Sequence, residues 1–366
     1  MPALKQLKKI AKDALAVPAV RRTYEGATRG VLEVAGSTRV GATLYSLPGF
    51  LTFNREQYAV LSGRRAYYRN LSRPRPSHVE LRRNIHRLEK GMIMRPRRDV
   101  FARDYILETL DFYAETVGSD IDPVELAWAH KVLTRFFSLV DLSDPTMTRA
   151  HDMFTALPSP HDLPTEESVE RHLAPYQAQD RPEATVSYED LLALAQRRRS
   201  VRWFQDRPVD RELIDKALRV GREGPTACNR LPYEYLVFDD PETVRKVASI
   251  PFGAGGYSDQ IPTLVVVKGN LSSYFSPRDR HVPYIDASLA SMGFMLALET
   301  LGLSSSVINW PDFEPLEMKM AKTLGLEPHE RVIFLMAVGY PLPEAEVPSS
   351  PKKSLSVLRT YDAPVA

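Results

Sequence analysis

The sequence contains almost no cysteine, and this scarcity limits the chemistry that the chain can support. Cys228 is the single cysteine among 366 residues. One thiol cannot form an internal disulfide or a cysteine-rich zinc site, and a chain without disulfides suits a reducing compartment. The eight histidines show no paired metal spacing such as HxxxH. We therefore predict no metal ion and a cytoplasmic location.

Long apolar runs and nucleotide-binding glycine motifs are missing as well. No apolar run reaches the roughly 18 residues that span a bilayer, and the N-terminus lacks the apolar core of a signal peptide. The glycine-rich stretch at 252–262 precedes an expected strand instead of opening a helix, and neither GxGxxG nor GxxxxGK[ST] occurs. We interpret this stretch as a connector. A nicotinamide donor would therefore bind without a dinucleotide fold of its own.

Charge is distributed unevenly along the chain. Residues 1–104 carry 22 Lys and Arg against 8 Asp and Glu, a net charge of +14, and the remainder carries −12. Such a segment is attracted to phosphates, anionic lipid or an acidic protein surface. Residues 4–16 have the pattern of a basic amphipathic helix, which can lie on a membrane surface. The simplest interpretation of the charge is a solvated or internally neutralised surface, and the helix can equally dock on its own protein or a dimer mate. Peripheral contact with an anionic membrane through residues 1–22 is the alternative.

Helix and proline patterns divide the chain into three predicted parts. Residues 1–140 form a basic helical module, with helices following Ser77 and near 104–117 and 122–140. Residues 141–186 form an acidic, proline-rich connector, and residues 187–366 alternate between helix and strand patterns. The helices are expected at 210–222, 241–249, 285–301 and 313–324, and the strands at 233–238, 263–268, 304–309 and 331–338. This alternation predicts an α+β domain in which helices cover a sheet.

Several helix ends have recognisable signals. Ser77 with Glu80 predicts a capping box, and Gly91 would end that helix. Ser187 with Asp190 predicts a second cap, and Asp286 would cap the helix over 285–301. The basic residues between 86 and 98 allow two interpretations, a second anion site or an ion-pair surface.

Two stretches carry the strongest chemical signal. RRRSVRWF (197–204) gathers arginines around Ser200, and guanidinium forks with a hydroxyl suit a phosphate group. Alone, such a cluster at a helix end is typical of a solvated surface. GPTACNRLPYEYLVF (224–238) begins with small residues against which a flat ring can lie, and the Asn229 amide can donate to and accept from a ring edge. Together they predict a ligand with an anionic tail and a planar head, the shape of flavin mononucleotide (FMN).

These stretches resemble the FMN-dependent nitroreductase superfamily, whose members carry RRSxRxF-type and APSxxNxQP-type motifs. Residues 284–310 and 330–341 are similar to the family's central helix, flavin-edge loop and last core strand. The resemblance covers residues 187–361, and Leu231 stands where members often carry Gln. It implies a nitroreductase-like fold with a mostly antiparallel sheet, and a homodimer with FMN at the subunit interface.

The resemblance also implies the site residues. The phosphate and ribityl contacts would be Arg198, Arg199, Ser200 and Arg202. The contacts to the ring would be Pro225, Thr226, Ala227 and Asn229, and those at the flavin N5 edge Ser305, Ser306 and Asn309. Lys352 or Lys353 would close the phosphate site from the tail. Candidates for the acceptor pocket are Arg230, Leu231 and Trp310. No catalytic side chain is assigned, because the hydride chemistry occurs on the flavin, and Cys228 receives no role.

The implied function is an FMN-dependent oxidoreductase with a ping-pong mechanism. NADH or NADPH would reduce FMN, and an electron-poor nitro, quinone or enone compound would then accept the hydride or electrons. A flavin-dependent dehalogenase and a dehydrogenase of a biosynthetic intermediate are alternatives. A different class is a membrane-surface or nucleic-acid-associated protein that uses residues 1–104, with the flavin fold as a dimerisation scaffold. No nucleic-acid motif is present, so we do not expect nucleic acid as a partner.

Overall fold

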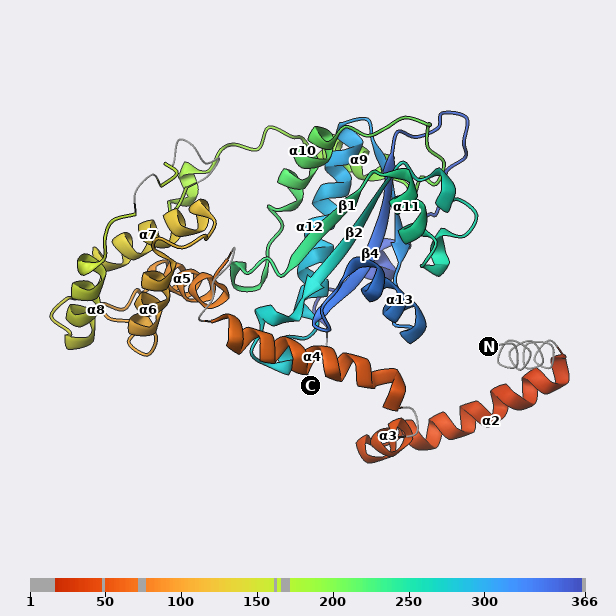
Figure 1. Cartoon of the computed structure of the whole chain (residues 1–366), viewed down its shortest axis with the longest axis horizontal. Helices are drawn as coiled ribbons and strands as arrows, with labels where there is room; N and C mark the ends of the chain where they lie inside the picture. Colours follow the sequence, from red (N-terminus) through yellow and green to blue (C-terminus); the bar gives the residue numbers. More distant parts are fainter. Residues whose placement is uncertain (1–16, 48–49, 72–76, 161–162, 166–171, 364–366) are drawn as a thin grey trace. The chain divides into compact units, whose positions relative to one another are not determined.

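A computed structural model describes residues 17–47, 50–71, 77–160, 163–165 and 172–363 (Figure 1). The chain divides into two compact units, Met1–Gln57 and Tyr58–Ala366. In the first unit, α2 (Pro18–Gly36) contacts α3 (Arg39–Ser46), and α4 (Phe50–Asn70) begins there and continues into the second unit. The predicted amphipathic helix at 4–16 lies outside the described residues. None of the described helices is long and apolar enough to cross a membrane.

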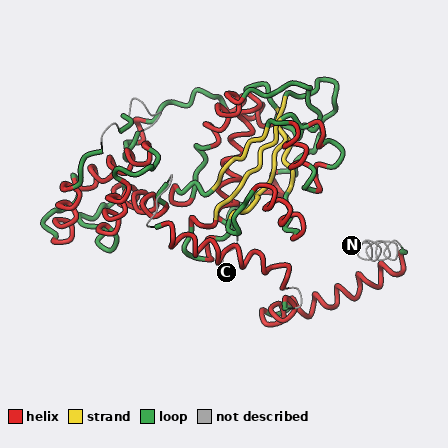
Figure 2. The backbone as a smooth tube through the Cα atoms, viewed as in Figure 1, coloured by secondary structure: helices red, strands yellow, loops and turns green. Residues whose placement is uncertain are grey.

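The second unit contains an antiparallel sheet of four strands in the order β1-β2-β4-β3 (Figure 2). The strands are β1 (Tyr233–Phe238), β2 (Thr263–Asn270), β3 (Ser304–Asn309) and β4 (Glu330–Gly339). The central pair, β2 and β4, is buried along almost its whole length. This burial explains why both strands are nearly continuous apolar runs in the sequence.

Helices cover both faces of this sheet (Figure 1). On one face, α10 (Arg211–Gly221) packs on α12 (Val282–Thr300), and Val265 and Met336 join Phe294 in the core. On the other face, α11 (Pro241–Ala248) and α13 (Glu314–Leu324) close a core that contains Val266 and Leu335. Successive residues of a strand point to opposite faces, so one apolar run supplies both cores. The predicted α+β class, a sheet covered by helices with an added helical region, is confirmed.

The helical region has a core of its own. It consists of α5 (Val79–Met92), α6 (Ile106–Thr116), α7 (Pro123–Phe137) and α8 (Pro145–Ala156). Leu81, Leu110, Phe136 and Met147 are fully buried between these helices. Two of the basic residues after 86 have contacts within the protein: the Arg87 guanidinium lies 3.5 Å from the centre of the Tyr105 ring, and Arg97 donates to the carbonyl of Leu139. These contacts favour the ion-pair surface over a second anion site.

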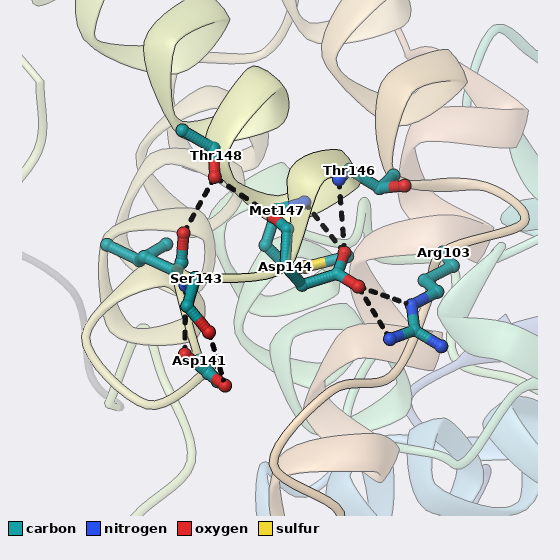
Figure 3. A network of polar contacts seen from close by, with 8 residues as sticks. Arg103, Asp141, Ser143, Asp144, Thr146, Met147 and Thr148 are labelled. Atoms are coloured by element: carbon teal, nitrogen blue, oxygen red, sulfur yellow. Dashed lines mark hydrogen bonds and ion pairs between the residues drawn. The ribbon is translucent and has the colours of Figure 1, made fainter.

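Helix α8 corrects the predicted connector, because it lies inside residues 141–186. Asp144 caps it by accepting the backbone N–H groups of Thr146 and Met147, and the Nε of Arg103 donates to the same carboxylate at 2.9 Å (Figure 3). Pro145 occupies the first turn, where proline is favourable because its missing N–H has no helical partner. The prolines of 141–186 predict a connector, but this one begins a helix. The division at 140 and 186 itself stays a prediction.

Three local predictions are wrong, and each fails through contacts distant in sequence. His78, not Ser77, caps α5, because its Nδ1 accepts the Leu81 N–H at 3.0 Å while Ser77 Oγ donates to Glu125 at 2.7 Å. Gly91 does not end α5, since the helix continues to Met92 and a Cβ at Gly91 would overlap the Phe101 ring.

Asp286 does not cap α12, the third error. The helix begins at Val282, and the buried Asp286 carboxylate instead accepts the N–H of Ala227 at 3.0 Å. The cap formed by Ser187 is confirmed, because its Oγ accepts the Asp190 N–H at 3.0 Å.

The remaining elements are short. The single-turn helix α14 spans Leu355–Leu358, and α9 spans Tyr188–Arg197 and contacts α12. Among the described residues, six 3₁₀ turns connect the larger elements: η1 (Ala178–Asp180), η2 (Ala227–Asn229), η3 (Phe252–Ala254), η4 (Ser258–Gln260), η5 (Leu271–Ser273) and η6 (Pro277–Asp279). Two of them, η3 and η4, lie in the glycine-rich stretch that we interpreted as a connector.

Candidate functional site

Residues 197–204, which we call the arginine-rich loop, follow α9 and lie on the edge of the sheet. Ser200 forms a parallel bridge with Ser305 of β3, and the Val201 N–H donates to the Ser305 carbonyl at 3.1 Å. Because β3 is an edge strand, its outer backbone groups are available for this pairing. The structure therefore brings together two predicted parts of the site that are about one hundred residues apart in the sequence.

The arginines of this loop keep much of their hydrogen-bonding capacity. Arg198 and Arg199 are half-buried and Arg202 is exposed. The Nη1 of Arg199 donates to the Arg198 carbonyl at 2.9 Å. The Nη1 of Arg202 donates to the Ser200 carbonyl at 3.5 Å. A guanidinium group has five N–H donors, so these bonds leave most of them for an anion. The loop has the donors that a phosphate monoester needs.

Arg197 is held differently from the other arginines. Its Nε lies 3.2 Å from Glu299 Oε2, and Ser304 Oγ donates to the other oxygen of that carboxylate at 3.1 Å. Burial raises the pKa of the Glu299 carboxyl, and the nearby arginines oppose this shift. Glu299 lies near the end of α12, so this helix anchors the arginine-rich loop.

The turn over residues 224–231, which we call the ring turn, has an unusual backbone. Cys228, Asn229 and Leu231 have φ values of 56°, 51° and 48°, in the left-handed region that residues other than glycine rarely adopt. Such residues cost free energy and persist only where the surrounding structure holds them. The Thr226 hydroxyl accepts the Leu231 N–H at 3.3 Å inside the turn.

Helix α12 holds one side of the ring turn. Asp286 accepts the Ala227 N–H, and burial raises the pKa of its carboxyl. A Cβ at Gly224 would lie 2.9 Å from the Cα of Ala290, so only glycine allows the turn to approach the helix this closely. Asp286 and Glu299 are thirteen residues apart on α12, a span of about 20 Å at 1.5 Å per residue. One helix thus carries both the arginine-rich loop and the ring turn.

Helix α5 also contacts the ring turn. The Nε of Arg82 donates to the Asn229 carbonyl at 2.7 Å, and an Nη2 of Arg230 lies 3.6 Å from Glu80 Oε1. The Arg230 side chain is buried, with its guanidinium carbon 5.0 Å from the centre of the Tyr274 ring. Sequence reasoning missed Arg82 and Glu80. The available signal was that Glu80 adjoins the apolar stripe of its helix, where an unpaired carboxylate is costly.

The other predicted site residues occupy varied surroundings. Ser305 and Ser306 are buried in β3, whereas Asn309 is exposed at its end. Thr226, Ala227 and Leu231 are half-buried, and Pro225 is exposed. Lys352 and Lys353 are exposed in an extended segment before α14. Trp310 is a core residue whose Nε1 donates to Glu317 at 2.6 Å, which favours the core interpretation over a pocket wall.

The family of the chain is decided by its matches to known proteins. The model of the nitroreductase family matches residues 195–255 and 253–340. A protein of Archaeoglobus fulgidus with the provisional name NADH dehydrogenase/NAD(P)H nitroreductase is 30% identical over 162 residues, which cover 43% of this chain and 89% of the relative. The chain belongs to the nitroreductase family.

Two further matches are a second named relative and a crystal structure. Iodotyrosine deiodinase 1 of Homo sapiens is 24% identical over 219 residues, which cover 52% of this chain and 75% of that protein. A crystal structure of a Parabacteroides distasonis protein, provisionally named as an NADH dehydrogenase/NAD(P)H nitroreductase, is 27% identical with a TM-score of 0.42. It covers 47% of this chain and 97% of that one. The sequence relatives of this nitroreductase-family chain thus include a nitroreductase-named protein and a deiodinase.

Proposed function

We propose that this nitroreductase-family protein is an FMN-dependent oxidoreductase that takes hydride from NADH or NADPH and reduces an electron-poor organic acceptor. The observation that carries the proposal is the pairing of Ser200 with Ser305, which joins the arginine-rich loop to β3. Helix α12 then links this loop to the ring turn through Glu299 and Asp286. These contacts support one elongated site with an anion-binding end and a turn of small residues.

The residues of this site fit FMN. Arg198, Arg199, Ser200 and Arg202 would hold the phosphate, and the backbone of residues 225–229 would lie against the ring. The Ser306 hydroxyl is buried and has no hydrogen-bond partner among the described residues, as expected of a group that awaits a ligand atom. Of the remaining candidates, Asn309 would contact the flavin edge, and Lys352 or Lys353 would contact the phosphate. When bound, FMN supplies the hydride chemistry, and the protein orients it and excludes water.

The acceptor has two candidate classes. Nitro, quinone and enone compounds accept hydride or electrons directly. The 219-residue match to iodotyrosine deiodinase 1 favours, as a second candidate, a reductive dehalogenation in which two electrons and a proton replace halide by hydrogen. Arg230 and Leu231 lie beside the proposed ring contacts and would border the acceptor. A screen of nitroaromatics, quinones, enones and halogenated phenols, with halide release as a separate readout, distinguishes these classes.

A homodimer is part of the proposal. Helix α12 exposes Ile285, Leu289 and Met292, whose spacing places them on one helical face, and 56%, 48% and 40% of their surfaces are exposed. Helix α9 exposes Tyr188, Leu191 and Leu192 beside it. Exposed apolar residues on two neighbouring helices support a protein interface here. A second copy would cover it and complete the site around the cofactor.

The test of the proposal begins with the absorbance spectrum of the purified protein. Flavin bands that bleach on anaerobic addition of NADH or NADPH are expected, and the faster donor is identified by the same titration. Replacing Arg198 and Arg202 together by alanine should strip FMN, because the phosphate loses its guanidinium donors. Arg211→Ala is the control, since Arg211, at the start of α10, is exposed and pairs with Asp239 just after β1. A double variant with full flavin content would overturn the phosphate assignment, and a colourless wild type that refuses added FMN would overturn the function.

A further inference from the structure

Arg82 connects the helical region to the ring turn through one short hydrogen bond. It lies on α5, and its Nε donates to the Asn229 carbonyl at 2.7 Å across 147 residues of sequence. Asn229 has a φ of 51°, between the left-handed Cys228 and the equally strained Leu231 two residues later. A charged donor at this carbonyl therefore acts at the most strained part of the turn.

Arg82 is itself held in place from α7. Its Nη1 donates to Glu125 Oε2 at 2.7 Å, and its guanidinium carbon lies 5.3 Å from the centre of the Trp128 ring. Glu125 is only 3% exposed and also accepts the His78 N–H and the Ser77 hydroxyl. A planar guanidinium can bond Glu125 and the Asn229 carbonyl at once, whereas an ammonium group cannot reproduce this fork. The Arg82 guanidinium is thus held in one orientation between Glu125 and the Asn229 carbonyl.

A second contact from α5 reinforces the first. Glu80 faces the buried Arg230 side chain, and Arg83 donates to the other Glu80 oxygen at 2.8 Å. Two successive residues of the ring turn, Asn229 and Arg230, are thus fixed by one helix outside the predicted flavin domain. None of the three left-handed positions, Cys228, Asn229 and Leu231, is a glycine. Tertiary contacts must therefore stabilise their conformations.

We propose that Arg82 is a positioning residue for the ring turn, and that α5 is therefore a working part of the flavin site. By holding the Asn229 carbonyl, Arg82 fixes the conformation in which residues 226–229 meet the flavin ring. This inference rests on the proposed FMN site. It assigns the helical region a task in cofactor binding that the flavin domain does not perform alone.

The test compares Arg82→Ala and Arg82→Lys with the control Arg103→Ala. Arg103 belongs to the same helical region, but it pairs with Asp144 at the start of α8 (Figure 3). Each protein is assayed for FMN affinity, flavin midpoint potential and unfolding by urea. In the FMN-free proteins, the rate of alkylation of Cys228 by iodoacetamide reports the conformation of the turn directly, since Cys228 is the single cysteine.

The expected result is a weaker and looser site in the Arg82 variants. Loss of a charge-assisted hydrogen bond should raise the Kd for FMN about tenfold or more in Arg82→Ala. Alkylation of Cys228 should accelerate and the midpoint potential should shift, with Arg82→Lys between Arg82→Ala and wild type. Arg103→Ala should leave the Kd for FMN, the rate of Cys228 alkylation and the midpoint potential close to wild type. If Arg82→Ala does not fold, Arg82→Lys provides the same comparison.

Two outcomes would overturn the inference. In one, the Arg82 variants retain wild-type FMN affinity and Cys228 alkylation, which leaves the proposed function intact. In the other, FMN affinity falls in Arg103→Ala as well, in proportion to stability, which makes the role of Arg82 merely structural. A wild type that binds no FMN defeats the proposed function instead. In that case the Cys228 rates alone decide whether Arg82 positions the turn.

Discussion

At the scale of single residues, Gly91 shows how a distant contact reverses a local preference. In an exposed helix, alanine is more stable than glycine by about 1 kcal/mol. Here an added methyl group would overlap the Phe101 ring, and overpacking of a core costs about 1–3 kcal/mol. Gly91→Ala should therefore lower the urea midpoint of unfolding. The same substitution in a Phe101→Leu background should cost less, and a raised midpoint in the wild-type background would contradict the packing.

His78 makes the stability of the helical region depend on pH. Burial lowers the pKa of this imidazole below its usual 6.5, and the neutral ring accepts the Leu81 N–H at Nδ1. The unfolded state therefore binds the proton more readily than the folded state. The contribution to the free energy of unfolding is present above pH 6.5 and is lost as pH falls through the lowered folded-state pKa.

The matched variant for this effect is His78→Asn, which keeps a capping acceptor but does not titrate. Burial also lowers the pKa of His130 and His329, so both proteins should lose stability in acid. Wild type should lose more between about pH 7.5 and about pH 5.5, as measured by urea unfolding at each pH. Equal losses in the two proteins would show that His78 does not titrate in this way.

At the scale of elements, the helices and strands between 210 and 338 were predictable because their signals are local. Strands such as 263–270 are apolar runs, and Ser187 and Asp240 cap helices through their own next turn. All eight helices and strands expected between 210 and 338 occur, with starts within three residues of the predicted ones. The Ser200–Ser305 pairing places the arginine-rich loop beside β3, and the roles assigned to its residues stay a prediction.

The ring turn and its supports were not predictable in the same way. No sequence signal marks Cys228 and Leu231 as left-handed, because neither is glycine. The bond from Arg82 spans 147 residues, so no local pattern reveals it. The sequence predicts Asp286 as a helix cap, but α12 begins at Val282, so Asp286 lies about one turn inside the helix. Each of these features depends on tertiary contact.

Helix α12 supports a prediction about assembly. A helix that is apolar around its whole circumference is normally buried on all sides, yet Leu289 is 48% exposed in the single chain. Leu289→Glu would place a charge in the proposed dimer interface, and the variant should sediment as a monomer and lose FMN. Met318→Glu on α13, where Met318 is 60% exposed on the other face of the sheet, is the control. A dimeric, fully flavinated Leu289→Glu protein would exclude this face as the interface.

At the scale of the whole molecule, the N-terminal part of the chain combines basic charge with exposed apolar residues. Residues 1–47, which include α2 and α3, carry 8 Lys and Arg against 3 Asp and Glu, a net charge of +5. Within the first unit, α2 and α3 bury none of their side chains, and their exposed apolar residues include Val20, Tyr24, Val31 and Leu44. Basic segments with exposed apolar surface bind anionic membranes through both charge and burial. This combination supports peripheral membrane contact as a role separate from flavin chemistry.

Deletion of residues 1–47 tests this role. The wild type should float with vesicles that contain anionic lipid, should float less with purely zwitterionic vesicles, and should detach as salt screens the charges. The deletion removes α2 and α3 but leaves α4 and the supports of the ring turn, so flotation should disappear while FMN content and reduction by NADH or NADPH persist. Unchanged flotation would exclude these helices as the anchor. Loss of FMN on deletion would show that the first unit supports the flavin site, which would remove the separation of roles on which the prediction depends.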